Sequence, residues 1–536
     1  MGRTARIPLL AALALAIAAL LAPASALAFG PLSSFGSEGK GAGQMNSAEN
    51  VAVGLDGDVY VADRNNNRID VFAPAGQFLF AFGRGVNATM GAADPSLCTT
   101  ASGCVEGERS AAAGGFNDLR DLAIAPSGNV LVADNSNGRV DVFSSQGRFL
   151  FAFGKDVGPS GSDVCTEPCG VGNGVGAGGL GAPRGVAIDS GRVYVADNSN
   201  GRVSVFTEAG EFLFAFGKKV NPVDLPTDPA AADPNVCTVN TDCRPGAAEG
   251  AGALSTPHGI EVAAARVYVA NTNNGRVEVF STAGQFLFAF GKGVNPNGGD
   301  VCDRASDCLD GTGEEGAGEL DDPLAIAADA GGAIYVGDGN ARVNVFTAQG
   351  SFMRAFGLGV INEAAEFQQC TAMTGCKEGA GDVPLAPGSV LKPLGLAFDR
   401  TGALYVSESA TGKARVERFG EPEQPVVAKP KPSKMFTLGK LKLNRKKGTA
   451  TLAVTVPGAG SLGLAGKGVR QVSRSTASAA TVQLTVKLTG KAKRKLLASG
   501  KAKVRVSVTF MPTGGDATTQ ARALVLKKAL RRPSRR

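Results

Sequence analysis

A 25-residue pattern that recurs six times constrains the fold of this chain more than any other feature. Residues 193–217, VYVADNSNGRVSVFTEAGEFLFAFG, give its clearest copy. An acidic residue or an asparagine ends the VYVAD-like segment of every copy, at Asp63, Asp134, Asp197, Asn271, Asp338 and Glu408. Successive copies lie 63 to 74 residues apart, a period that is typical of chains built from stacked modules of one kind.

Each copy predicts four β-strands that are joined by short polar turns. Valine, tyrosine and phenylalanine alternate with small or polar residues, so each strand has two different faces. Phe212, Phe214 and Phe216 share one face of the fourth strand, and we expect them and their equivalents to pack between neighbouring sheets. Four-stranded modules repeated around an axis make a β-propeller. The sequence therefore predicts an all-β fold with a six-bladed β-propeller over residues 29–420.

The motifs of these copies resemble the NHL repeat. The resemblance is carried by VYVAD, a short turn of Asn, Gly and Arg, the segment V-x-V-F and the ending G-x-F-L-x-x-F-G, and it covers all six modules. It implies a six-bladed propeller. It implies no particular activity, because this fold serves binding and catalysis alike.

The sixth module departs from the pattern because it stops at Gly420 after three strands. Residues 29–36, FGPLSSFG, are similar to the fourth strand that it lacks. We predict that this N-terminal segment completes the last blade and closes the ring, which removes an exposed sheet edge.

Five long inserts separate the fourth strand of one blade from the first strand of the next, and each holds two nearby cysteines. Spacing alone does not fix connectivity, but the recurrence of one pair per insert favours local disulfides. A zinc site is disfavoured because no pair is spaced C-x-x-C and His258 is the only histidine. We expect all five inserts on one propeller face. The predicted disulfides are Cys98–Cys104, Cys165–Cys169, Cys237–Cys243, Cys302–Cys308 and Cys370–Cys376.

The N-terminus has the features of an export signal. Arg3 and Arg6 precede an apolar run over residues 9–21, and Ala-Leu-Ala at 26–28 is a small-x-small cleavage site. We expect a cleaved signal peptide over residues 1–28 and a secreted or cell-surface protein, in a compartment that permits disulfides. An uncleaved anchor is the alternative.

The C-terminal region differs from the propeller in charge. Residues 421–536 hold 26 Lys and Arg against 3 Asp and Glu, so the first 420 residues carry 29 against 45. Residues 421–434 are a proline-rich linker, and residues 435–536 predict seven short strands, a short helical turn and a basic tail. Seven strands in about 100 residues suggest an Ig-like β-sandwich, although the Cys–Trp–Cys signature is missing. Its charge favours anionic cell-envelope polymers, or it serves only to solubilise the strand surfaces.

Two sets of polar residues are candidates for function. The acidic residues that end the second strands and the arginine of each following turn recur in every blade, which favours a structural role. The positions that differ between blades lie where the first strands begin, near the mouth of the central channel. There, polar residues on one half of the ring face Leu324 and Leu394 on the other, which suits a small polar ligand or an ion. The alternative is a mouth lined only by solvated side chains that bind nothing. The candidates are Glu49, Asn50, Arg120, Asp121, Arg184 and His258.

These observations favour a non-catalytic binding or scaffold protein that recognises a protein or glycan through the insert-bearing face. The alternative is a calcium-dependent lactonase or esterase at the channel mouth, whose only evident ligands are Glu49, Asn50 and Asp121. The peptide-amidating lyases, which the fold resembles, hold zinc with several histidines, and one histidine does not reproduce that. Nucleic acid is disfavoured by the acidic propeller. We assign no catalytic residue, no metal ligand and no cofactor other than that possible calcium, and we expect a monomer.

Overall fold

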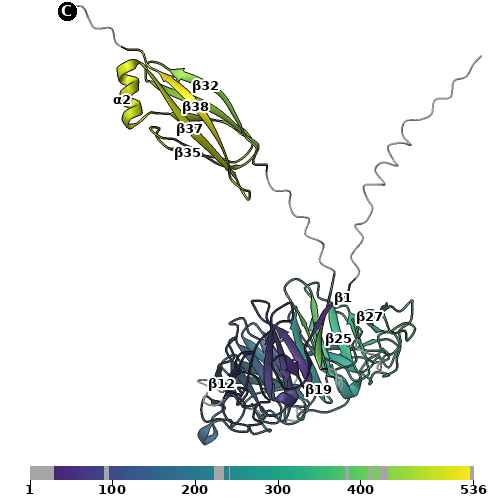
Figure 1. The fold of residues 1–536 in the computed structure, drawn as a ribbon. Coiled ribbons are helices and arrows are strands. Elements are labelled where there is room, and N and C mark those ends of the chain that lie inside the picture. Colours follow the sequence, from purple (N-terminus) through teal and green to yellow (C-terminus); the bar gives the residue numbers. More distant parts are fainter. Residues whose placement is uncertain are drawn as a thin grey trace, which may run out of the picture. The chain divides into compact units, whose positions relative to one another are not determined.

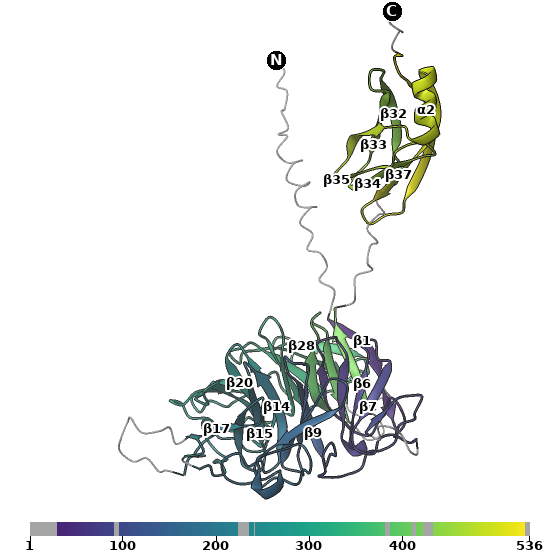
Figure 2. The same cartoon turned by 90° about the vertical axis from the view of Figure 1, so that its left-hand side faces the viewer.

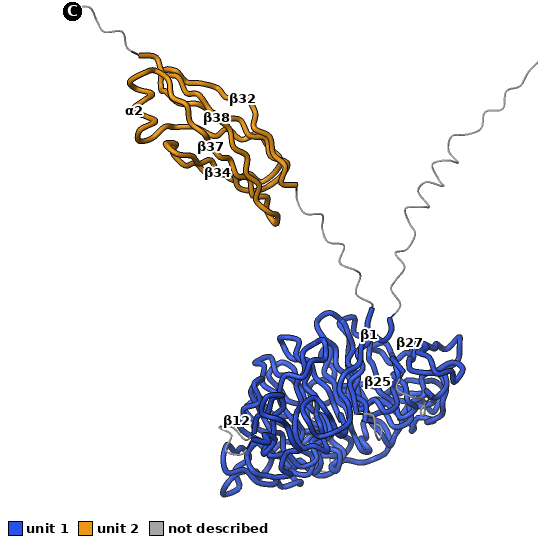
Figure 3. Tube along the Cα trace, in the orientation of Figure 1, with its two compact units in different colours: residues 1–422 blue, residues 423–536 orange. Residues whose placement is uncertain are grey.

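The computed structural model describes residues 29–89, 96–222, 235–240, 242–380, 386–409, 414–421 and 433–530. The chain divides into two compact units, residues 1–422 and 423–536 (Figure 3). The predicted signal peptide, most of the predicted linker and residues 531–536 lie outside the described ranges. Within those ranges, no helix is both long and apolar enough to cross a membrane.

Six antiparallel sheets follow one another along the first unit (Figures 1 and 2). In each of the first three, the strands pair in sequence order. They are β4 (Ala48–Val53), β5 (Val59–Asp63), β6 (Arg68–Phe72), β7 (Phe78–Phe82) and β8 (Leu97–Cys98); β9 (Leu119–Ile124), β10 (Val130–Asp134), β11 (Arg139–Phe143), β12 (Phe149–Phe153) and β13 (Val164–Cys165); β14 (Pro183–Asp189), β15 (Arg192–Asp197), β16 (Arg202–Thr207), β17 (Phe212–Phe216) and β18 (Val236–Cys237).

The fourth and fifth sheets repeat this order, and the sixth takes its last strand from the N-terminus. They are β19 (Pro257–Ala263), β20 (Arg266–Asn271), β21 (Arg276–Ser281), β22 (Phe286–Phe290) and β23 (Val301–Cys302); β24 (Ala325–Ala328), β25 (Ile334–Asp338), β26 (Arg342–Phe346), β27 (Phe352–Leu358) and β28 (Phe367–Cys370); β29 (Pro393–Phe398), β30 (Leu404–Glu408), β31 (Arg415–Gly420) and β1 (Gly30–Phe35). A small parallel pair, β2 (Ser37–Glu38) and β3 (Gln44–Met45), follows β1.

The first strands of the six sheets form a closed ring. Each contacts the first strand of the next sheet, and the last, β29, contacts β4 again. A ring of sheets whose first strands surround an axis is the β-propeller arrangement, so the predicted all-β propeller class is confirmed.

A fifth strand in five of the blades was not predicted. The first cysteine of each insert lies in or at the end of a short strand that pairs with the fourth strand, as Ala81 does with Cys98 and Ala215 with Cys237. Four of these strands are only two residues long, too short to show an alternating pattern. The inserts therefore begin as extensions of the blades.

The N-terminal strand closes the last sheet as predicted. β1 pairs antiparallel with β31, from Gly30 opposite Gly420 to Phe35 opposite Val416. Phe29, just before β1, lies with its ring centroid 5.1 Å from that of Phe356 in the fifth blade. The first and last parts of the propeller chain are thus joined through backbone pairing and aromatic packing.

Phenylalanine packs between the blades as predicted, but the three phenylalanines of a fourth strand do not share one face. A register shift at Phe206 places Phe212 against the preceding blade, whereas Phe214 and Phe216 pack against the next blade. The third-strand Phe143 lies 5.0 Å from Phe82 of the preceding blade and 5.5 Å from Phe149 of its own, measured between ring centroids. The same arrangement recurs as Phe206 with Phe153 at 5.1 Å. Side chains of this size supply much of the buried area of each interface.

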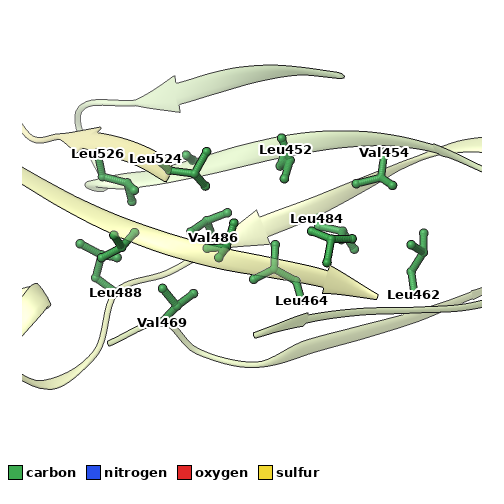
Figure 4. Close-up of a cluster of buried hydrophobic side chains, with 14 of the residues drawn as sticks. Leu452, Val454, Leu462, Leu464, Val469, Leu484, Val486, Leu488, Leu524 and Leu526 are labelled. Carbon is green, nitrogen blue, oxygen red and sulfur yellow. The ribbon is translucent and has the colours of Figure 1, made fainter. Parts of the chain in front are cut away.

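The second unit consists of two antiparallel sheets and one helix. One sheet has the order β32 (Thr437–Asn444), β33 (Thr449–Val456), β36 (Ala480–Val486), and the other β35 (Val472–Thr476), β34 (Gly460–Ala465), β37 (Lys501–Pro512), β38 (Thr518–Lys527), with α2 at Gly490–Ser499. Leu452, Leu464, Leu484 and Leu524 belong to one core that both sheets share (Figure 4). Seven strands are present, as the sequence predicts; the Ig-like assignment remains a prediction.

Candidate functional site

A pocket opens where the first strands of the propeller begin. Its volume is about 440 Å³, which lies within the range of small-molecule sites. It is on the insert-bearing face, because each insert ends at the start of a first strand. Its lining comprises Ser47, Glu49, Arg64, Arg120, Arg184, Thr256, His258, Thr272, Asn273, Asp322, Leu324, Lys392, Leu394 and Ser409.

Four of the six predicted mouth residues line this pocket, namely Glu49, Arg120, Arg184 and His258. They form two separate contacts rather than one cluster. Arg120 donates from Nη1 to Glu49 Oε1 at 2.6 Å and from Nη2 to Asp118 Oδ2 at 2.9 Å. The charge of Arg120 is therefore balanced by two carboxylates.

The second contact joins Arg184 to His258, with 2.5 Å between Nη1 and Nε2. Burial, followed by the nearby Arg184, lowers the pKa of His258 to about 3. The imidazole is therefore neutral near pH 7, and its Nε2 accepts the hydrogen bond from the guanidinium. No carboxylate among the described residues lies within 4.0 Å of Arg184, in contrast to Arg120.

The other two predicted residues, Asn50 and Asp121, lie in a different cavity. It has a volume of about 270 Å³ and is enclosed by all six first strands along the central channel. Asp121 Oδ1 accepts from the Leu122 amide and Oδ2 from the Val186 amide, both at 2.7 Å. Asp121 therefore links the second and third blades, and burial raises its pKa to about 7.

Sequence analysis missed Glu261, which lines the same channel cavity. Burial, followed by the charge of Asp121, raises its pKa to about 8. A signal was present in the sequence, because the other five blades have alanine at the equivalent position: Ala52, Ala123, Ala187, Ala327 and Ala397. The sequence comparison covered only the first residues of each first strand, such as His258 and Gly259, and Glu261 lies further along the same strand. Arg64, Asp118 and Lys392 were missed because they lie outside the first strands.

We predict that Glu261 makes the propeller less stable as the pH rises. Its folded-state pKa is raised, so the stability that its proton provides is present below pH 4.5 and is lost toward pH 8. Glu261→Gln should reduce the loss of unfolding free energy between pH 5 and pH 8 by about 1 kcal/mol, a figure kept low because solvent reaches the channel. Urea unfolding at the two pH values measures this. Glu211→Gln, at an exposed position, is the control; parallel pH profiles for Glu261→Gln and the parent would contradict the prediction.

The predicted calcium ligands do not fit a calcium site. Both Asp121 oxygens accept backbone amides, and Glu49 is held by Arg120. Asn50 Oδ1 accepts from the Val51 amide at 2.5 Å. Calcium requires six to eight oxygens that converge on one point. Among the described residues, no group of three or more His, Cys, Asp or Glu side chains could hold a metal.

The recurring acids and arginines are buried and connect the inserts to the blades. Asp134 Oδ1 accepts from the Asn117 amide at 2.9 Å, at the end of the first insert. Arg139 donates to Gly115 O at 3.0 Å in that insert and to Gly170 O at 3.1 Å in the next. The arginines at the equivalent position of the other blades are also buried, which supports the structural interpretation. They are Arg68, Arg202, Arg276, Arg342 and Arg415.

The structure joins the ten cysteines in the five local disulfides that the recurrence favours. Two of the loops that these disulfides close contain an exposed apolar side chain. Met373, inside the Cys370–Cys376 loop, is 97% exposed, and Val239, inside the Cys237–Cys243 loop, is 65% exposed. Further exposed apolar residues of the inserts are Val105, Val171, Val175, Leu309 and Ile361.

Comparison with protein families shows that the chain carries NHL repeats. The family model described as NHL repeat matches residues 116–143 and 180–206, which span the three inner strands of the second and third blades. Protein brain tumor from Drosophila melanogaster is 27% identical over 185 residues, which are 34% of this chain and 14% of that protein. E3 ubiquitin-protein ligase TRIM71 from Rattus norvegicus is 52% identical over 48 residues, which are 9% of this chain and 6% of that protein. The chain thus spans a small part of both relatives.

Solved propeller structures are similar over much of the chain at low identity. A streptogramin B lyase matches 74% of this chain and 100% of its own with 11% identity and a TM-score of 0.38. The WD40 β-propeller domain of Doa1 matches 74% of this chain and 98% of its own with 9% identity and a TM-score of 0.37.

Proposed function

We propose that this protein, a β-propeller with NHL repeats, is a secreted or cell-surface binding protein without catalytic activity. Its insert-bearing face recognises another protein, and a glycan is the alternative ligand. The observation that carries the proposal is the exposure of Met373 and Val239 inside two of the disulfide loops of the inserts. Exposed apolar side chains that combine into one patch are a feature of surfaces that a partner covers, and we assign these loops to such a patch.

The inserts are held in place before any partner binds. Each is closed by a disulfide and extends a blade through its first cysteine, and buried arginines bond to insert carbonyls. Binding through such loops loses less conformational entropy than binding through mobile ones. The NHL repeats at residues 116–143 and 180–206 support a protein partner.

The basic second unit suits a separate role in retention at an anionic envelope polymer. Lys501, Lys503 and Arg505 are exposed at alternate positions of β37, while the intervening side chains face the core. Such a row of cations on a solvent-facing strand attracts anionic polymers in a salt-dependent way. We place this interaction in the same proposal, as the means by which the propeller is kept near its partner.

The test is capture of partners from extracellular and envelope fractions at low and high salt. We expect a protein that the parent retains at high salt and that the double variant Met373→Asp, Val239→Asp binds at least about tenfold more weakly, since buried apolar anchors dominate interface energies. Leu55→Asp is the matched control, because Leu55 is exposed in the turn at the opposite end of the first strand. Material that salt alone releases is assigned to the second unit. Equal binding of the partner by the double variant and the parent would contradict the proposal.

A further inference from the structure

We infer that the mouth pocket is a binding site for an organic carboxylate with a short apolar body, with Arg184 and Lys392 as its cationic contacts. The inference goes beyond the proposed function, because the pocket residues are not those of the disulfide loops. Four observations support it: an unbalanced pair of cations, free donors on Arg184, a neutral histidine that positions it, and two leucines in the lining.

The cations of the pocket are not equally balanced. Arg64 bonds to Asp118 and lies 4.0 Å from Glu49, and Arg120 bonds to both carboxylates. Neither Arg184 nor Lys392 has a carboxylate within 4.0 Å among the described residues. The positive charge that the pocket does not neutralise therefore lies at Arg184 and Lys392.

The charged residues that line the pocket carry a net positive charge that suits a single carboxylate. Four cations, Arg64, Arg120, Arg184 and Lys392, face two carboxylates, Glu49 and Asp322, while His258 is neutral. Asp118, which bonds to Arg64 and Arg120 from outside the lining, reduces the excess from two to one. A monovalent anion complements this pocket better than a doubly charged one.

Arg184 has donors to offer. A guanidinium carries five N–H groups, and the only bond described for this one joins Nη1 to His258 Nε2. Its Nε is buried and has no hydrogen-bond partner within the described ranges of the chain. A planar guanidinium with free donors matches the two oxygens of a carboxylate in a bidentate pair.

His258 holds Arg184 without adding charge. Burial, followed by the charges of Arg184, Arg120, Lys392 and Arg64, lowers the pKa of His258, so the imidazole adds no positive charge to the pocket. A neutral imidazole accepts the bond that fixes one end of the guanidinium and leaves the remaining donors for a ligand. His258 is therefore a positioning residue.

The fifth and sixth blades contribute two leucines to the pocket, beside Asp322 and Lys392. Leu324 and Leu394 stand at the positions that Arg184 and His258 occupy in their own blades, and both line the pocket. A ligand whose carboxylate binds Arg184 and Lys392 shares the pocket with these leucines, which can cover its apolar part. This favours an aliphatic or aromatic acid over inorganic phosphate, which has no apolar part.

Binding of hexanoate to the full chain tests the inference, with 1-hexanol and inorganic phosphate as comparison probes. By calorimetry and saturation-transfer NMR we expect one saturable hexanoate site that neither comparison probe occupies. Arg184→Met and Lys392→Met should each weaken hexanoate at least about tenfold, the loss expected for a hydrogen bond to a charged group. Arg148→Met is the matched control, because Arg148 is exposed at the start of β12, on the opposite face.

The outcomes separate this inference from the proposed function. The double variant Met373→Asp, Val239→Asp should bind hexanoate as the parent does, whatever happens to its protein partner. Lys392 is exposed, so Lys392→Met keeps the test valid if Arg184→Met melts early. Absence of hexanoate binding, unchanged binding in Lys392→Met, or phosphate binding as tight as hexanoate would each overturn the assignment.

Discussion

Deletion of residues 29–34 is expected to lower the melting temperature of the propeller by about 10 °C or more, the change that corresponds to several kcal/mol in a domain of this size. The deletion removes most of β1 and so exposes the ladder edge of β31. It also removes Phe29, which packs against Phe356, lies under the guanidinium of Arg354 at 4.9 Å, and accepts from Gln369 Nε2 at 2.8 Å through its carbonyl. The fifth and sixth blades lose contacts at the same time.

Calorimetry of the deleted and parent chains measures the effect, and a peptide of residues 29–36 supplied in trans provides the control. The peptide should restore part of the lost stability, because it replaces the missing strand rather than acting at a distance. Size-exclusion chromatography should show self-association of the deleted chain through the open edge. If the deleted chain melts like the parent, β1 does not close the ring.

The sequence predicts this closure because the sixth module lacks a strand that the other five modules contain. Comparison with these five modules shows that the fourth strand is missing after Gly420. It also shows that residues 29–36 are similar to that missing strand. The same logic predicts the aromatic interfaces and the local disulfides. In each case the pattern recurs. Alignment of the repeats identifies the equivalent positions, and so fixes a strand register that one strand alone does not define.

The candidate site was only partly predictable, since it depends on features that do not recur. Glu49, Arg120, Arg184 and His258 were found by comparing blades at one position, yet their pairing into two contacts depends on side-chain directions across blades. Asp121 was placed with them because it is adjacent in sequence. Successive residues of a strand face opposite sides, and the structure puts Asp121 in the channel instead.

The buried arginines show how a residue can look functional and be structural. Arg139 is fully buried and lies 3.1 Å from Asp141 and 3.7 Å from Asp134. The same guanidinium donates to carbonyls of two consecutive inserts, at Gly115 and Gly170. Arg139 therefore holds two inserts against the blade. A substitution of Arg139 should affect partner binding only because it lowers the stability of the propeller.

Replacement of Arg139 by methionine is expected to cost about 3–5 kcal/mol of unfolding free energy, the range for breaking a buried ion pair from one side. The variant leaves Asp134 and Asp141 buried without their cation and leaves the carbonyls of Gly115 and Gly170 without their donor. Urea unfolding measures the loss. Limited proteolysis should show earlier cleavage near Gly170, because the second insert loses an anchor.

The matched control is Asp141→Asn, because another blade has asparagine at the equivalent position. The fifth blade has Asn344 at the equivalent position, where its Nδ2 donates to Asp338 Oδ2 at 2.8 Å while Arg342 lies 3.5 Å from the same carboxylate. One carboxylate is thus sufficient to balance a blade arginine, and Asp141→Asn should change the unfolding free energy by no more than about 1 kcal/mol. A comparable loss in both variants would mean that the second carboxylate, rather than the bonds to the inserts, is what Arg139 requires.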